Sequence, residues 1–123
     1  MNWMDLFRGR RSDFRWKDLT SAEHLQQLIE ASEDKPQLIF KHSTRCSISR
    51  MVKHRFEKEW KDDLLADIWM LDLLTYRPVS DGVAELLEVE HQSPQAILIV
   101  DGNVAYEAAH SSISAFDMAE ILS

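Results

Sequence analysis

The hydrophobic positions of this 123-residue chain follow two alternating periods along most of its length. Short apolar runs at 37–43 (QLIFKHS) and 67–74 (DIWMLDLL) are typical of buried strands. Between them, apolar residues recur every three or four positions, the period of a helix that packs on one side. The pattern therefore predicts strands and helices that alternate, beginning with a short strand at 14–19.

Four segments have the helical period. The first spans 20–32 and opens with Thr20 followed by Glu23, a capping-box pattern. The second runs from Cys46 to about Trp60, and its expected buried face comprises Ile48, Met51, Val52, Phe56 and Trp60. The third, 76–90, carries Pro78 in its first turn. The last, 112–123, closes the chain, with Ile113, Phe116 and Ile121 as candidate buried residues.

The C-terminal part predicts a β-hairpin. The runs 95–100 (QAILIV) and 104–109 (VAYEAA) flank a compact turn at Asp101-Gly102-Asn103. The predicted order is β-α-β-α-β-α-β-β-α. Strands that alternate with helices require parallel pairing, and a hairpin adds antiparallel strands. The fold class is therefore α/β, with three α/β/α layers around a central mixed sheet.

Length and composition favour one globular domain with a substantial core. Residues 1–15 are expected to form an N-terminal strap, and 16–123 the domain. The net charge of −7 argues against a nucleic-acid partner. The longest apolar run, 96–100, is too short to span a membrane, and the N-terminus does not resemble a signal peptide. A single cysteine without an export signal favours a cytoplasmic location.

The single cysteine, Cys46, lies between a predicted buried strand and a predicted helix. A lone cysteine is most often a small buried hydrophobe. At a helix N-terminus, however, unpaired N–H groups and the helix dipole favour an anion such as a thiolate. The segment 41–58 adds six basic residues against one acidic residue, a net charge of +5 in an acidic chain. Cys46 is therefore the candidate nucleophile, and Arg45 precedes it directly.

Ser49 stands three residues after Cys46, where a dithiol motif would have its second cysteine. Its hydroxyl is a candidate donor to the Cys46 thiolate, although an ordinary first-turn serine explains it equally well. A serine cannot resolve a disulfide, so an external thiol must release any mixed disulfide on Cys46. His42 is a less favoured candidate base. No spacing of His, Cys or acidic residues predicts a metal site.

The segments KHSTRCSIS, YRPVSDGVAE, HQSPQAILI and AAHSSIS together resemble the monothiol bacilliredoxin-like family of the bacillithiol redox system, within the thioredoxin-like superfamily. The resemblance spans roughly residues 16–123. It implies a thioredoxin-like fold with Cys46 as nucleophile. It also implies that Pro94, for which sequence alone favours a trans bond, is a cis-proline facing Cys46, and that the backbone of Ser93 pairs with a bound substrate. A further implication is a thiol pocket lined by Lys41, Ser43, Thr44 and Arg45.

One position departs from the family pattern. The family motif often reads Cys-Pro-x-Ser, whereas this chain has Ser47 after the cysteine. A proline there would stiffen the first helical turn. Its absence is expected to change the redox poise of the site rather than the fold.

The function implied is monothiol thiol–disulfide exchange. Cys46 would remove a small thiol, such as bacillithiol, from S-thiolated client proteins, with that thiol as co-substrate and no bound cofactor. Three alternatives stay open: an arsenate-reductase-like enzyme, for which CSISR offers Arg50; a non-catalytic thioredoxin-like binding module; and an iron–sulfur carrier that shares a cluster between two protomers. Turnover of arsenate would favour the first alternative, and slow alkylation of Cys46 would favour the second. A coloured protein after reconstitution with iron and sulfide would favour the third.

Overall fold

The structure is a computed structural model that describes residues 14–123. The expected strap at 1–15 falls almost wholly outside the described residues and stays a prediction. The strands are β1 (Lys17–Asp18), β2 (Gln37–His42), β3 (Asp67–Asp72), β4 (Gln95–Val100) and β5 (Asn103–Ala109). The helices are α2 (Ala22–Ala31), α3 (Ser47–Glu59), α4 (Arg77–Leu87), the short 3₁₀ helix η1 (His110–Ser112) and α5 (Ala115–Leu122).

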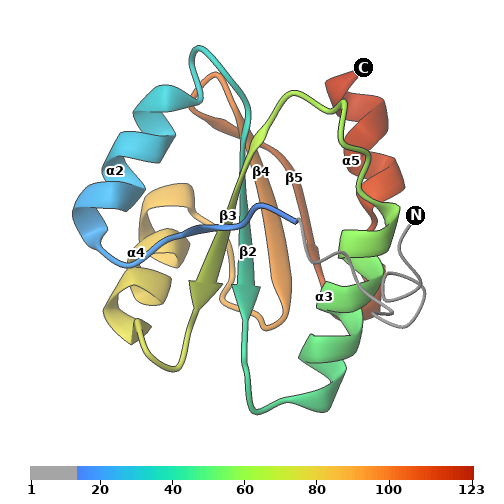
Figure 1. Cartoon of the computed structure of the whole chain (residues 1–123). Coiled ribbons are helices and arrows are strands. Elements are labelled where there is room, and N and C mark those ends of the chain that lie inside the picture. The colour runs from blue at the N-terminus through green and yellow to red at the C-terminus, as the bar shows by residue number, and fades with distance from the viewer. Residues whose placement is uncertain (1–13) are drawn as a thin grey trace.

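The five strands form one mixed sheet in the order β1-β3-β2-β4-β5. The strand β2 lies at its centre, parallel to β3 and antiparallel to β4. Helices α2 and α4 cover one face, and α3 and α5 cover the other (Figure 1). The predicted element order and the three-layer α/β/α class are both confirmed.

Alternation along β2 divides the core between the two faces, because successive strand side chains point in opposite directions. Leu38 and Phe40 pack with α3 and α5, whereas Ile39 packs with α2 and α4. All six residues of β2 are buried. The polar residues Lys41 and His42 at its end are thus buried on opposite faces of the sheet.

Aromatic side chains dominate the α3 face of the core. Phe40 and Phe56 lie 5.4 Å apart between ring centroids, and Trp16 stacks on Phe56 at 5.6 Å. The Trp16 indole Nε1–H donates to Glu57 at 2.6 Å, and Lys53 pairs with the same carboxylate at 2.9 Å. A satisfied indole at the core boundary fixes the segment before β1 against α3.

Three sequence-based expectations need correction. Helix α2 is capped by Ser21, which accepts from the N–H of His24, rather than by Thr20. Ile48 and Met51 of α3 are 58% and 70% exposed, not buried. Of the three residues expected to be buried in the last helix, Ile113 is buried. Phe116 and Ile121 are 57% and 44% exposed. In α3 the reason is the direction of these side chains. Ser49 and Val52 of the same turns face the sheet and are buried, so Ile48 and Met51 lie on the solvent side of the helix (Figure 1).

The hairpin turn agrees with the sequence. Asp101 and Gly102 connect β4 and β5 with φ values of 52° and 77°. Two consecutive residues with positive φ form the turn that matches the twist of antiparallel strands. Within residues 14–123, no helix is long and apolar enough to cross a membrane.

Candidate functional site

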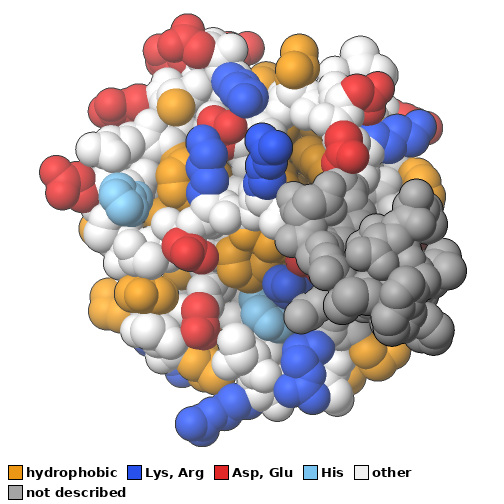
Figure 2. Space-filling view, in the orientation of Figure 1, with side chains coloured by type: hydrophobic (Ala, Val, Ile, Leu, Met, Phe, Trp, Pro, Cys, Tyr) orange, Lys and Arg blue, Asp and Glu red, His pale blue; other side chains and the backbone are white. Residues whose placement is uncertain are grey.

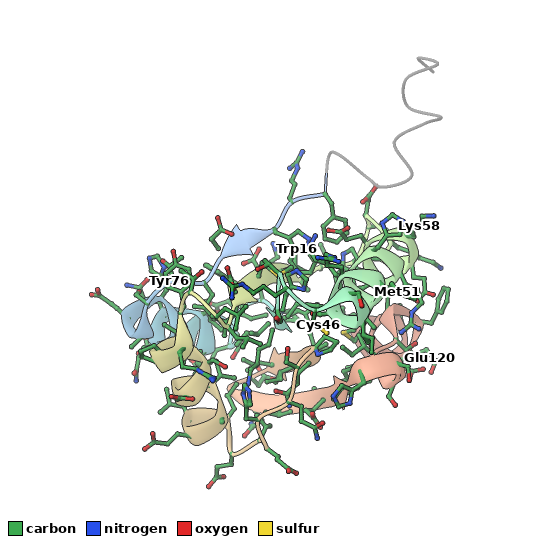
Figure 3. All side chains as sticks on the ribbon, turned by 90° about the horizontal axis from the view of Figure 1, so that it is seen from below. Trp16, Cys46, Met51, Lys58, Tyr76 and Glu120 are labelled. Carbon is green, nitrogen blue, oxygen red and sulfur yellow. The ribbon has the colours of Figure 1, made fainter. Side chains whose placement is uncertain are left out.

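Cys46 occupies the N-cap of α3, immediately before its first helical residue. Its backbone is extended (φ −100°, ψ 120°), and its carbonyl accepts the N–H of Arg50 at 3.1 Å, the first bond of the helix. The side chain makes no capping hydrogen bond and is partly exposed as a free thiol. Figure 3 shows Cys46 at the end of the helix that also carries Met51. The thiol is thus accessible beside the unpaired N–H groups of the first turn.

Ser49 is fully buried, and its hydroxyl is used beneath the Cys46 loop. The Oγ atom lies 2.7 Å from Nδ1 of His42 and accepts the backbone N–H of Ser43 at 3.1 Å. Within residues 14–123, no hydrogen bond joins Ser49 to Cys46. When the His42 proton is on Nε2, Nδ1 is an acceptor, and the Ser49 hydroxyl donates its one proton to it. Ser49 therefore ties the end of β2 to the start of α3, and a direct catalytic role for it stays a prediction.

His42 lies under α3 with little exposed surface. Burial lowers its pKa, and the positive charge of Lys53 lowers it further, whereas Asp72 and Glu57 oppose the shift and Arg50 adds to it slightly. The imidazole is therefore neutral at pH 7. Its hydrogen bond goes to Ser49, so the geometry favours a supporting role over that of a base at the thiol.

The loop before Cys46 presents a basic surface. Ser43 is half-buried, whereas Thr44 and Arg45 are exposed. The guanidinium of Arg50 donates to the carbonyl of Thr44 at 3.1 Å, which holds this arginine beside the loop. In Figure 2, Lys and Arg side chains lie at the lower edge as well as across the upper part of this face, while acidic side chains gather along the upper and left edges. The surroundings of Cys46 therefore suit an anionic reactant.

Ser93 and Pro94 end the loop 88–94 before β4. The peptide bond between them is cis, as the resemblance implies. The Pro94 carbonyl accepts the N–H of His110 at 2.9 Å, and Ser93 Oγ is buried without a hydrogen-bond partner among the described residues. Gln95, the first residue of β4, pairs with Lys41 near the end of β2. This loop therefore lies at the same end of the sheet as the segment that runs from β2 to Cys46.

Lys41 has a different place from the one implied by the resemblance. Its side chain has 0% exposed surface, and its Nζ lies 2.7 Å from Nδ1 of His91. It is directed to the α4 face, away from α3. A side chain with no exposed surface does not line an open thiol pocket, so the expected place of Lys41 in that pocket is wrong.

His91 and the exposed pair Ile48 and Met51 are the features that sequence reasoning missed. His91 looks like an ordinary polar residue along the chain, and only the strand register brings it to Lys41. Ile48 and Met51 have the spacing of a buried face. The buried face of α3 instead includes Ser49, Val52 and Phe56, and a serine in that face gives no hydrophobic signal along the chain.

Among residues 14–123, no group of three or more His, Cys, Asp or Glu side chains could hold a metal ion. The site is therefore described by one thiol, its basic loop and the polar residues that support them.

Solved structures with the same architecture are numerous. One, whose description proposes an oxidoreductase with a thioredoxin fold, is 30% identical, covers 84% of this chain and 89% of its own, and has a TM-score of 0.73. Thioredoxins from Malassezia sympodialis and Fasciola hepatica are each 14% identical to this chain, with TM-scores of 0.67. The match covers 88% of this chain and 88% of the Malassezia protein, and 86% of this chain and 95% of the Fasciola protein. The fold is that of thioredoxin.

A thioredoxin fold with its single cysteine at the N-terminus of the helix after the central strand defines a thiol redox protein. The family model described as "Monothiol bacilliredoxin BrxC" matches residues 17–118. The chain belongs to the monothiol bacilliredoxin family.

Ser49→Ala is expected to lower the free energy of unfolding by about 1–3 kcal/mol, because it leaves buried hydrogen-bonding groups of His42 and Ser43 without a partner. Urea denaturation at pH 7 measures the change. Ser47→Ala is the matched control, since Ser47 is exposed on the same helical turn, and it should change stability by less than about 0.5 kcal/mol. Equal effects of the two substitutions would contradict the structural role of Ser49.

Ser47→Pro is expected to raise the free energy of unfolding by about 0.4–1 kcal/mol. Ser47 is the first residue of α3, where a proline fits, and Cys46 before it is already extended, as a residue preceding proline must be. Thermal and urea unfolding of the reduced protein measure the gain, with Ser47→Ala as the reference for loss of the hydroxyl. Destabilisation by proline would show that the helix does not begin at this residue.

The stability contributed by Lys41 is expected to depend on alkaline pH. Burial lowers its pKa from 10.5 to about 8, although the charges of Asp81 and Glu107 oppose the shift. Between these values the unfolded chain binds more protons than the folded one, so folding becomes more favourable as pH rises. Relative to Lys41→Met, the wild type should gain roughly 3 kcal/mol between pH 8 and 10.5. A pH-independent difference in urea unfolding would contradict this.

Proposed function

We propose that this protein performs monothiol thiol–disulfide exchange through Cys46, removing a small thiol such as bacillithiol from client proteins. The single observation that carries the proposal is the partly exposed thiol at the N-cap of α3. There the sulfur is open to an incoming disulfide and lies at the positive end of the helix dipole, beside the free N–H groups of the first turn.

Two sulfur exchanges make up the cycle. The Cys46 thiolate attacks the small-thiol sulfur of a mixed disulfide, a new S–S bond forms to Cys46, and the client leaves as its thiolate. A second small thiolate or a reductase thiol then attacks the adduct and regenerates Cys46. Each step breaks one S–S bond and forms one. Because the described chain has serine at position 49, the second thiol comes from outside.

The charge around Cys46 supports an anionic small thiol as co-substrate. Arg45 is exposed beside the cysteine, and Arg50 is held against Thr44. A carboxylate-bearing small thiol would bind here through charge-assisted hydrogen bonds. This chemistry requires a reducing compartment, so we infer a cytoplasmic location.

Cys46→Ser is expected to abolish client release. A client loaded with a bacillithiol mixed disulfide is mixed with wild type or variant, and free client thiol is measured over time. Mass spectrometry follows the adduct on Cys46 in parallel. Wild type should gain the mass of the small thiol in step with release, because its sulfur ends on Cys46.

Ser47→Ala is the matched control for this experiment, because it changes the neighbouring residue and keeps the thiol. It should release client and form the adduct. Equal release by wild type and Cys46→Ser would refute the proposal. A covalent complex of Cys46 with the client, rather than with the small thiol, would reverse the proposed direction of attack.

A further inference from the structure

The loop 88–94 contacts two residues that are direct neighbours on adjacent strands of the sheet. Lys41 of β2 pairs with Gln95 of β4 in the antiparallel register. The Lys41 Nζ contacts His91 Nδ1 at 2.7 Å, and the Gln95 side-chain amide donates to the backbone carbonyl of Glu90 at 2.9 Å. Both contacts therefore hold the loop that ends at Pro94.

Among residues 14–123, His91 is the one side chain within hydrogen-bonding distance of the Lys41 ammonium. Ser80 Oγ lies 3.4 Å from the same His91 nitrogen. Asp81 and Glu107 attract the ammonium, but neither forms a salt bridge with it in the described part of the chain. The strongest polar contact of this buried lysine is thus made to one side chain of the loop.

Keeping a lysine at this position is unfavourable for folding. Desolvation holds the pKa of Lys41 at about 8, so at neutral pH the folded state contains a charge that would be more stable in water. A methionine would fill similar volume without this cost. The benefit of the lysine therefore lies in what it holds rather than in stability.

The next residue along β2 acts on the opposite face. His42 contacts Ser49, and Ser49 accepts the N–H of Ser43 at the start of the Cys46 loop. Because side chains alternate along a strand, Lys41 holds the loop 88–94 on the α4 side while His42 holds the start of α3 on the other. The end of one strand thus contacts both the loop that ends at Pro94 and the start of α3.

We propose that Lys41 is a positioning residue that, through His91, holds the loop 88–94 in the orientation in which a protein disulfide docks beside Cys46. The proposal rests on the thiol-exchange function proposed above. It assigns to Lys41 an effect on docking of the protein substrate and none on the thiol itself.

The test compares Lys41→Met, His91→Leu and the double variant, with Lys61→Met as the control for loss of an exposed lysine. The catalytic efficiency of client release should fall about tenfold or more in each single variant, because a misplaced loop misaligns the disulfide. The double variant should be no worse than either single variant, since both remove one contact. His91→Gln keeps an acceptor and should restore most of the efficiency.

Two readouts separate positioning from loss of structure. Alkylation of Cys46 by iodoacetamide needs no docking and should keep the wild-type rate. Amide exchange of His110, whose N–H donates to Pro94, should accelerate in Lys41→Met. The melting temperature at pH 7 should not fall, because the buried charge is gone.

Several outcomes would overturn the proposal: wild-type efficiency in Lys41→Met, additive losses in the double variant, or alkylation that slows in parallel with client release. If wild type itself releases no client, the proposed function fails. The exchange of His110 then still decides whether Lys41 holds the loop, and an unchanged exchange rate would reject it.

Discussion

Burial of β2 between two layers of helices is the constraint on which the rest of the structure depends. The strand pairs on both edges, and all six of its residues are buried. A shift of its register by one residue would exchange Leu38 and Phe40 with Ile39 between two differently shaped halves of the core. The register is therefore fixed, and with it the point at which the chain leaves the sheet and reaches Cys46 four residues later.

The end of this strand departs from the rule that buried strands are apolar. Lys41 and His42 are both desolvated, and each has a hydrogen-bond partner in another segment: His91 of the loop 88–94 for Lys41, and Ser49 of α3 for His42. Violations of local rules tend to concentrate at functional sites, where stability is exchanged for geometry. Here the two residues contact two different segments, a loop and the start of α3, because a strand sends consecutive side chains to opposite faces.

The electrostatics of the site contrast with those of the whole chain. An acidic protein with a net charge of −7 places basic residues around its single thiol. Opposite charges on one small domain direct an anionic reactant to the basic region and away from the remaining surface. The proposed monothiol exchange would benefit from this arrangement, because both the mixed disulfide and the thiol that completes the cycle would come from outside.

The sequence by itself determined the element order, the mixed sheet, the hairpin at Asp101-Gly102 and the place of Cys46 at a helix start, since these depend on local periodicity, turn chemistry and chain connectivity. Tertiary structure decided the rest. Ile48 has the spacing of a core residue, yet the polar Ser49 beside it takes the buried position of that turn. Nothing in the sequence predicts the contact of Lys41 with His91, fifty residues away, because only the strand register brings the two together. Contacts between distant segments follow from packing, which periodicity does not encode.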